Sequence, residues 1–466
     1  MEELPNRKRF SSQHGDLSVV EAAQYHRVPG VETLFMATPA LGFSSINISD
    51  QRLFDSGTGA YLGVNYHGLS FMSSYTSLET TSFLTKLSDV RWKKGFFDIG
   101  YSLKPTAKWD MTFALTYTRS TLDAPLYPDV TRDSYETVLE WTNFFTFSDT
   151  DRLTFGALFN HEQGIETYLG TPSFNDVDGS RSSTGLYIQH EHKFTPDLKL
   201  IGGVQIKKIG NLSVNAVPRA GILWNPSTHV TLKTLYGGAF HAASLFQTLI
   251  NYPMFKGNPN LRPETVATLD VQASYENNRV QGSAGYFHSR QANLIVPQLL
   301  TAPAYINLQQ AAIFQGFDAD GKYYLHQNWF LLGSAIYFAT HSAVESSNVT
   351  PIPSFAAKAG ISYSSKKGID LSLFDAYQGH ISGFAAALNP HPDAVHTLNA
   401  HIRLDLAKYL HKDSATGFAF FLNATNLTNQ QIWLPDNYAY PPNTDPLNNR
   451  RTLLFGFEIF GKRESN

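Results

Sequence analysis

Residues 109–117, WDMTFALTY, alternate between large apolar side chains and polar or small ones. The odd-numbered residues are all apolar, while the residues between them are Asp, Thr, Ala and Thr. Because successive side chains of a β-strand point to opposite faces, a strand here has one apolar and one polar face. A helix would scatter the same residues around its circumference. We therefore predict a β-strand with a single apolar face.

The same alternation recurs along the chain, for example in residues 97–104 and 398–406. It predicts twenty strands between about residue 41 and residue 460, and two more fit within Leu17–Ala23 and Val31–Thr38. Short polar turns alternate along the chain with longer links, except that the link at 209–213 is also short. Outer-membrane barrels show this asymmetry, because their periplasmic turns are short and their external loops are long.

We therefore predict an all-β fold, a closed transmembrane antiparallel up-and-down β-barrel of 20–22 strands with long external loops. An even number of strands would place both chain ends on the periplasmic side. A soluble all-β protein such as a propeller is the alternative, but no repeat of about 40–50 residues shares a signature here.

The composition agrees with a barrel whose strands face lipid on one side and a polar lumen on the other. Aromatic residues make up 13% of the chain and charged residues 16%, against about 25% charged in soluble domains. Mean hydropathy is nevertheless −0.22, which argues against a bundle of membrane helices. The formal charge of −3 argues against nucleic acid as a partner, because phosphate-binding surfaces need a basic excess. The absence of cysteine excludes disulfides and thiolate chemistry.

Two segments in the second half resemble a known family. Residues 240–244, FHAAS, are similar to the FRAPS box of TonB-dependent outer-membrane receptors, and residues 257–264, GNPNLRPE, to their GNPNLKPE box. Residues 421–428, FLNATNLT, resemble the penultimate-strand pattern of that family, and 451–460 its closing strand. The resemblance extends over about 190–460, whereas 40–190 share only the rhythm of strands.

We expect the residues of the GNPNLRPE box to organise a loop and to contact substrate rarely, because the prolines of that box restrict φ and bias the preceding residues to extended backbone. The residues concerned are Phe240, Asn258, Pro259, Asn260, Leu261, Pro263 and Glu264.

Family members carry an N-terminal plug domain inside the barrel, preceded by an energy-coupling box, and no plug pattern is found here. We therefore expect residues 1–40 to be a short N-terminal segment, either a remnant of the plug–barrel junction or the first strands. The transmembrane barrel would occupy 41–460, and 461–466 would be a polar tail. The TonB complex could be a partner only if a plug is supplied from elsewhere.

Enzyme signatures such as G-x-S-x-G, H-E-x-x-H and the phosphate-binding loop are absent from the sequence, so we predict that the protein is not an enzyme. His190 and His192 share one strand face, but a metal would need a third and a fourth donor. A polar strand end that faces water is the favoured interpretation, and we predict no metal site and no cofactor.

The resemblance implies binding of an iron–siderophore complex, haem or cobalamin at the external mouth. Rigid aromatic side chains supply contact area at low entropic cost, although aromatic residues at strand ends can instead form the interfacial girdle. His241 stands where the family has Arg and is a candidate haem ligand. The candidate substrate-binding residues of the external loops are His241, Tyr252, Phe255, Tyr305, Tyr377, Trp433, Tyr438 and Tyr440.

We therefore predict a multi-pass protein of the bacterial outer membrane that binds and takes up a bulky nutrient, such as an iron–siderophore or another metal chelate. Its partners would be outer-membrane lipid and that chelate, and no nucleic acid. The alternatives are a plugless passive porin-like channel, a truncated receptor fragment without transport, and a soluble β-rich binding protein.

Overall fold

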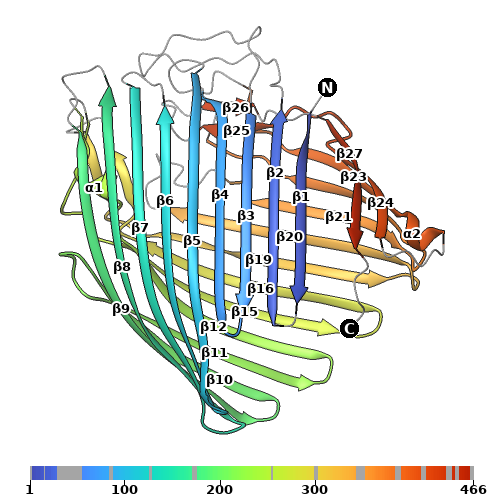
Figure 1. The fold of residues 1–466 in the computed structure, drawn as a ribbon, viewed down its shortest axis with the longest axis horizontal. Coiled ribbons are helices and arrows are strands. Elements are labelled where there is room, and N and C mark those ends of the chain that lie inside the picture. The colour runs from blue at the N-terminus through green and yellow to red at the C-terminus, as the bar shows by residue number, and fades with distance from the viewer. Residues whose placement is uncertain are drawn as a thin grey trace.

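Among the described residues, a single antiparallel sheet of 21 strands dominates the computed structural model, and each strand of that sheet pairs with the next in chain order. Figure 1 shows this up-and-down arrangement. It confirms the predicted fold class. The structure describes residues 3–14, 16–28, 55–82, 88–124, 129–169, 176–252, 255–298, 303–342, 352–383, 390–410, 416–436, 443–446 and 451–461.

The strands of the large sheet are longest in its first half. They are β1 (Glu3–His14), β2 (Leu17–Val28), β3 (Asp55–Tyr66), β4 (Leu69–Ser82), β5 (Ser88–Thr106), β6 (Trp109–Ala124), β7 (Asp129–Thr146), β8 (Asp151–Leu169), β9 (Val177–Thr195), β10 (Leu198–Ile209), β11 (Asn215–Ser227), β12 (Val230–His241), β15 (Glu264–Glu276), β16 (Val280–Ala292), β19 (Ala312–Tyr324), β20 (Trp329–Ser342), β21 (Phe355–Ser364), β22 (Ile369–Gln378), β23 (Val395–Asp405), β24 (Thr416–Thr425) and β27 (Thr452–Gly461).

Further elements lie in the links between these strands. Four short strands form a sheet of their own, and two more form a hairpin. Neither of the two helices among the described residues has the length and apolar character needed to cross a membrane. These elements are α1 (Leu245–Leu249), β13 (Asn251–Tyr252), β14 (Phe255–Lys256), β17 (Ile295–Gln298), β18 (Ala304–Asn307), β25 (Trp433–Asp436), β26 (Asn443–Pro446) and α2 (Leu406–Tyr409).

The sheet curves so that two walls face each other. Strands β3 to β9 stand nearly upright in Figure 1, and the strands from β12 to β23 cross obliquely behind them. The tight turns between β1 and β2, β3 and β4, and β5 and β6 lie together at the lower end. One of these turns has two residues, His67 at φ 45° and Gly68 at φ 82°, as a two-residue hairpin requires.

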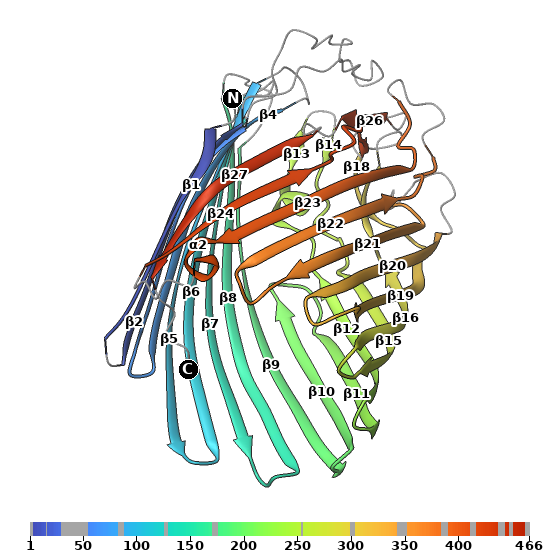
Figure 2. The ribbon, with the colours of Figure 1, turned by 90° about the vertical axis from the view of Figure 1, so that its right-hand side faces the viewer.

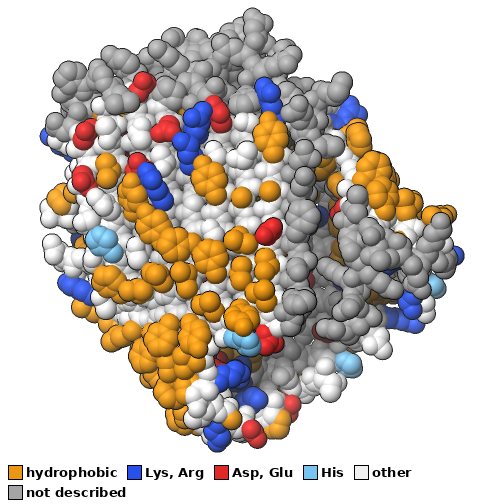
Figure 3. All heavy atoms as spheres, in the orientation of Figure 1, with side chains coloured by type: hydrophobic (Ala, Val, Ile, Leu, Met, Phe, Trp, Pro, Cys, Tyr) orange, Lys and Arg blue, Asp and Glu red, His pale blue; other side chains and the backbone are white. Residues whose placement is uncertain are grey.

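The two faces of the sheet separate apolar from polar side chains as the alternation predicts. Phe97 stacks on Tyr117 with ring centroids 5.5 Å apart. On the opposite face of the same two strands, the Thr116 hydroxyl donates a hydrogen bond of 2.6 Å to Asp98. Figure 3 shows apolar side chains gathered over the outward wall, with charged side chains mostly above and below them. The polar face therefore lines the lumen.

The start of the chain contains one strand that the alternation did not predict. Within residues 1–40 the structure has β1 and β2, of which only β2 overlaps a predicted strand, Leu17–Ala23. The other predicted strand, Val31–Thr38, lies outside the described residues. The prediction missed β1 because Arg7, Lys8 and Arg9 interrupt any alternation of apolar and polar side chains.

Among the described residues the large sheet has 21 strands, which is within the predicted range of 20–22. Because each strand is antiparallel to the next, β1 and β27 run in the same direction. The start of β1 and the end of β27 therefore lie at opposite ends of the sheet (Figure 1). Within the described residues, β1 pairs only with β2 and β27 only with β24, so no ladder closes the sheet there.

Candidate ligand-binding site

The link after β12 folds inward and places α1 against the lumen face of β8 and β9. The helix begins with a capping box, in which the Ser244 hydroxyl accepts from the Gln247 N–H and the Gln247 side chain accepts from the Ser244 N–H. Leu249 of this helix fills the space above Gly179, where any larger residue would collide with it. A short helix thus covers part of the inner wall near the long links.

Two arginines from the wall hold this link in place. Arg181 forms an ion pair with Glu162 and donates a hydrogen bond of 2.8 Å to the Ala243 carbonyl oxygen. The Arg132 guanidinium carbon lies 4.6 Å from the ring centroid of Phe246, within the range of a cation–π contact. All of these wall residues belong to the polar, lumen-facing side of the strands. The link is therefore fastened to the inner wall by charged side chains.

Arg132 also neutralises a buried carboxylate. The Arg132 Nε atom lies 3.1 Å from Glu166 Oε2, and the Tyr168 hydroxyl donates to the same carboxylate. The Glu166 side chain is almost fully buried, and an unpaired charge there would be costly. Arg132 thus connects a buried anion to the inward-folded link.

The GNPNLRPE box fastens this link to the one that carries β17 and β18. The Asn258 amide donates a hydrogen bond of 3.0 Å to the Tyr305 carbonyl oxygen, and the Arg262 N–H donates to Asn307 over 2.8 Å. Leu261 is only 2% exposed. Asn260 and Pro259 are exposed and Pro263 is buried.

Gly257 and Glu264 have separate roles at the two ends of the box. A Cβ at Gly257 would lie 2.6 Å from the Thr248 carbonyl carbon, so only glycine allows this approach to the backbone of α1. Glu264 accepts from the Ile295 N–H at 2.7 Å through one oxygen and lies 3.1 Å from His241 Nδ1 through the other. Most of the box side chains are therefore used within the protein.

A pocket of about 600 Å³ lies between α1 and the lumen face of β5, β6, β7, β8 and β9, near the strand ends that join the long links. This volume is within the usual range of small-molecule sites. Trp92 and Phe246 contribute aromatic surface to its lining. Its charged and polar lining includes Lys94, Thr118, Ser120, Arg132, Ser134, Glu136, Glu162 and Glu166.

Lys94 is the cation that this pocket leaves available. Arg132 is already paired with Glu166, whereas Lys94 forms no ion pair with any described residue. Its neighbour Lys93 points to the other face, where it lies 3.7 Å from Asp123. The pocket thus offers the aromatic side chains of Trp92 and Phe246 and the exposed ammonium group of Lys94 to a bound molecule.

The predicted site residues are only partly brought together by the structure. The Tyr305 ring lies 6.3 Å from that of Phe246, in an edge-on arrangement, so this residue borders the pocket. His241 stands at the end of β12, 69% exposed, beside Glu264. Trp433 lies in the β25–β26 hairpin, and Phe240 pairs with Thr265 in the wall. The side chains of Tyr252 and Phe255, and residues Tyr438 and Tyr440, lie outside the described part of the chain.

Tyr377 lies on the outward face. Its ring is 5.9 Å from that of Phe355 and 4.7 Å from that of His396. This is the arrangement of the interfacial girdle, the alternative to substrate contact.

Sequence reasoning missed Trp92, Lys94, Arg132 and Phe246. The first three occupy even-numbered positions of β5 and β7, and the alternation already assigns such positions to the lumen face. That signal could have identified them as lumen residues, but nothing local shows that α1 folds back onto them.

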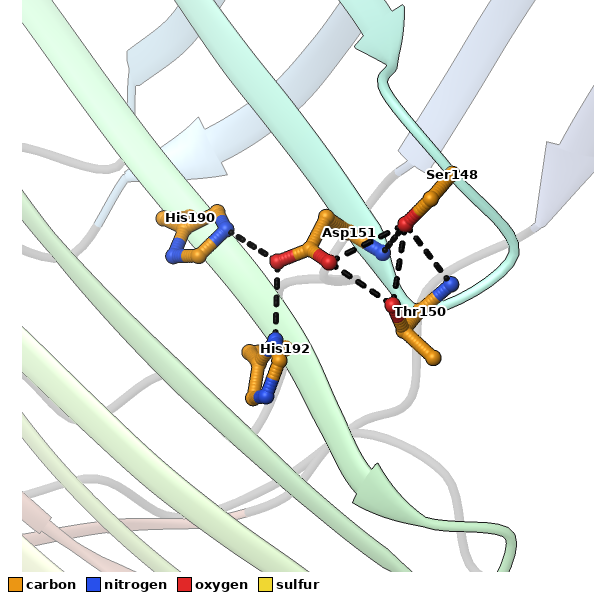
Figure 4. Close-up of polar contacts among 5 residues, drawn as sticks. All are labelled: Ser148, Thr150, Asp151, His190 and His192. Atoms are coloured by element: carbon orange, nitrogen blue, oxygen red, sulfur yellow. Dashed lines mark hydrogen bonds and ion pairs between the residues drawn. The ribbon is translucent and has the colours of Figure 1, made fainter.

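The cluster around His190 and His192 lies at the opposite end of the wall. Both imidazoles contact one oxygen of Asp151, at 3.1 and 2.8 Å, and Ser148 and Thr150 donate to its other oxygen (Figure 4). Asp151 lies at the turn, beyond the apolar membrane-facing part of β8. Hydrogen bonds from Thr150 and His192 hold the pKa of its carboxyl well below the usual range. Among the described residues, no group of three or more His, Asp or Glu side chains could hold a metal ion.

Comparison with known proteins identifies the fold and the family. The FrpB iron transporter of Neisseria meningitidis (F3-3 variant) is 12% identical, with a TM-score of 0.71, over 97% of this chain and 78% of the other. A mutant ferric enterobactin receptor, PfeA, of Pseudomonas aeruginosa in complex with enterobactin is 11% identical, with a TM-score of 0.77, over 98% and 80%. The siderophore receptor PirA of the same organism is 14% identical, with a TM-score of 0.69, over 97% and 76%.

A search of curated proteins found no match. The family described as TonB dependent receptor-like, beta-barrel, matches residues 40–427. That match covers well over half of the sequence and agrees with the boxes at residues 240–244 and 257–264. This chain therefore belongs to the family of TonB-dependent receptor-like β-barrels.

Proposed function

We propose that this protein binds a metal chelate, such as an iron–siderophore, at the long-link end of the barrel and takes it up across the outer membrane. Barrels of this family cross the bacterial outer membrane with strands. The similar structures include an iron transporter and siderophore receptors by name. The observation that supports this function best is the lumen-side pocket that combines Trp92, Phe246 and Lys94.

The pocket suits a large ligand with flat groups and negative charge. Trp92 and Phe246 would lie against the faces of the organic chelator, because aromatic side chains prefer stacked or edge-on contact with other rings. The Lys94 ammonium would attract an anionic chelate, whereas the paired Arg132 would hold the link that carries Phe246. Tyr305 would add contact area at the rim.

Passage beyond the pocket would use the polar lumen. The hydrogen bonds between Asp98 and Thr116, and between Glu140 and Tyr187, show lumen-facing groups that can interact with a hydrated solute. Energised transport through the TonB complex would require a plug domain inside the barrel. A barrel that works without one would conduct solutes passively.

Binding is tested by titrating the purified barrel in detergent with ferric catecholate and ferric hydroxamate chelates and following the quenching of tryptophan fluorescence. Lys94→Gln should weaken binding of an anionic chelate about threefold to tenfold, as expected for about 1 kcal/mol of lost attraction. Lys93→Gln is the matched control, because its side chain faces the other side of the same strand. Equal affinities for the two variants would contradict the assignment of this pocket.

Single-channel recording separates uptake from the porin-like alternative. A large ohmic conductance that no chelate changes would favour a passive channel. Chelate binding without such a conductance would favour the receptor, and the lack of both would favour a fragment that does not transport.

A further inference from the structure

A cavity on the outward face of the sheet plays no part in the proposed function. It has a volume of about 1020 Å³ and lies over the strands from β15 to β23. Tyr323, Leu331 and Leu373 form one side of it, and each of them is exposed on the surface that contacts lipid. We call this cavity the outer groove.

The floor of the outer groove is made of glycine and alanine. One row of cross-strand partners across it consists of Gly282, Gly321, Gly333 and Ala359, and the neighbouring row of Ala273, Ala284, Ala319, Ala335 and Ala357. The next row is large and aromatic, and it borders the floor on the side opposite Leu331. It consists of Tyr286, Phe317, Tyr337 and Phe355.

Two of these glycines are not required by the fold. A Cβ at Gly321 would lie 3.7 Å from the Gln281 carbonyl oxygen, and one at Gly333 would lie 3.8 Å from the Lys358 carbonyl oxygen, which are ordinary van der Waals distances. Neither glycine has a positive φ. Glycine inside a strand weakens it, because there is no side chain to pack. Gly321 and Gly333 therefore keep the groove open at a cost in stability that the sheet itself does not demand.

The outer groove runs across the membrane instead of around the barrel. Its central row starts at Tyr275, next to the tight-turn end of β15, and passes through Gly321 and Ala359 to Asp375, in the second half of β22. Figure 2 shows the strands from β15 to β23 stacked obliquely from the lower toward the upper end. At about 4.8 Å between strands the row is about 24 Å long, similar to the apolar band of an outer-membrane barrel, about 25 Å tall. A hydrocarbon chain in the groove would thus lie in the direction of the lipid chains around it.

The long-link end of the outer groove carries polar groups. Asp375 faces outward, and one of its carboxylate oxygens accepts a hydrogen bond of 2.8 Å from His396 Nδ1. Its other oxygen has no hydrogen-bond partner among the described residues. The Tyr377 ring lies 4.7 Å from the His396 ring on the same face. Lys322 is the single lysine or arginine of the lining, and its ammonium lies on the lumen face, over the Phe330 ring.

This distribution of polar groups fits an amphiphile with one polar end. A free carboxylate oxygen accepts hydrogen bonds from hydroxyl groups, whereas a phosphate beside Asp375 would meet a like charge. A membrane-spanning helix would be polar at both ends, but the lining at the tight-turn end includes the apolar Val230, Ala273 and Val280. A lipid with a hydroxyl-rich, uncharged head group matches the groove from end to end.

We propose that the outer groove binds one glycolipid of the external leaflet, with its acyl chains on the glycine and alanine floor and its sugar head group at Asp375, Tyr377 and His396. Sugar hydroxyl groups donate to the free oxygen of Asp375, and the Tyr377 ring provides a flat apolar surface for the sugar ring. The chains gain dispersion contacts with the floor between the two rows of large side chains.

Lipid retention by the full-length protein tests the groove. The protein is refolded in phosphatidylcholine vesicles that contain a minor share of monoglucosyl diacylglycerol with the same acyl chains, transferred to detergent and analysed by native mass spectrometry. The unchanged protein should retain one glucosyl lipid. Ala359→Leu, which fills the floor, should lower this retention about tenfold. Ala220→Leu is the matched control, because it adds the same side chain to the outward face of β11, outside the groove.

The polar end is tested separately. Asp375→Leu removes the acceptor and should lower retention of the glucosyl lipid about threefold to tenfold, as expected for one lost hydrogen bond to a charged group. Retention of phosphatidylcholine, whose head group has no hydrogen-bond donor, should be low and should not change.

Gly333→Ala tests whether this glycine serves the groove or the fold. In detergent without lipid, the variant should resist urea at least as well as the unchanged protein, because the added Cβ has space. A lower urea midpoint would show that the sheet needs the glycine and would overturn the proposal.

The lipid measurements can overturn the proposal as well. Equal retention of the glucosyl lipid by Ala359→Leu and Ala220→Leu would do so, as would retention of phosphatidylcholine in its place or of neither lipid by the unchanged protein. Mobility shifts on boiling establish that each variant is folded. None of these readouts involves a chelate, so they do not depend on the proposed function.

Discussion

The long strands β5–β9 and the short strands β21–β27 of the sheet build two different kinds of wall. The first group has 16 to 19 residues per strand, and the strands of the large sheet in the second have 10 or 11. A tilted strand needs about 9–11 residues to cross a bilayer. The short wall is therefore just long enough to span, whereas the long wall continues beyond the membrane toward the long links.

The surplus length is where the candidate site lies. Arg132, Glu166 and Arg181, which hold α1, belong to the parts of β7–β9 nearest the long links, and Trp92 and Lys94 to the same part of β5. The short wall presents exposed apolar side chains, such as the 64% exposed Phe457. The comparison indicates that the bilayer sets a minimum strand length, and that residues beyond it are available for binding.

The largest expected difference in stability is between a charge placed on the lipid face of the short wall and the same charge placed near the end of the long wall. Phe457→Lys places an ammonium on the lipid face near the middle of β27 and should lower the free energy of unfolding by about 2–4 kcal/mol. Ser180→Lys places the same charge on the outward face of β9, close to its long-link end, and should change it by less than about 0.5 kcal/mol. Urea unfolding in lipid vesicles measures both. Similar losses in free energy of unfolding for the two variants would contradict the assignment of the middle of β27 to the membrane and of the long-link end of β9 to the part beyond it.

The buried box residue tests whether the links can be loosened without affecting the walls. Leu261→Ala removes a side chain that is 2% exposed and should cost about 2–3 kcal/mol. The loss should be local, because the box joins two links and is not part of the large sheet. Hydrogen exchange should therefore speed up in residues 241–263 and stay unchanged in β21–β24. Uniform acceleration in all strands would show that the box supports the walls as well.

Removing the cation that pairs with Glu166 should have a slightly smaller effect. Arg132→Gln leaves that buried carboxylate with Tyr168 but without its ion-pair partner, which we expect to cost about 1–3 kcal/mol. The double variant with Glu166→Gln should recover part of this loss. If the free energy of unfolding lost in the double variant equals the sum of the losses in the two single variants, the Arg132–Glu166 pair does not stabilise the long wall.

The smallest effect is expected at His241. Its contact with Glu264 is exposed, so His241→Ala should change the free energy of unfolding by less than about 0.5 kcal/mol. Haem binding followed by absorption should be the same in this variant as in the unchanged protein. A lost haem signal would instead identify His241 as an iron ligand.

The walls could be predicted from sequence because alternation is a local signal. Residues 109–117 form one strand whose apolar face matches that of Phe97 in the neighbouring strand, and both were expected. β1 was missed because the charged run Arg7–Arg9 hides the alternation.

The candidate site was harder to predict because it depends on contacts between distant parts of the chain. Arg132 and Phe246 are more than a hundred positions apart, and no local pattern indicates that the link after β12 folds inward. Tyr305 was anticipated only because aromatic residues were counted in the external links. Alternation predicts that Lys94 faces the lumen. Whether its ammonium group is available to a ligand depends on which carboxylates form ion pairs with the other cations.

The central claim is that the apolar face of the strands contacts lipid while the polar face lines the lumen. Two single-tryptophan variants test it most directly, one retaining Trp141, which stacks on Phe113 on the outward face, and one retaining Trp92 in the pocket. In vesicles of brominated lipids, Trp141 should be strongly quenched and Trp92 should not, whereas iodide in the aqueous phase should quench Trp92 more. Quenching of Trp141 by iodide alone, with no effect of the brominated chains, would contradict the account.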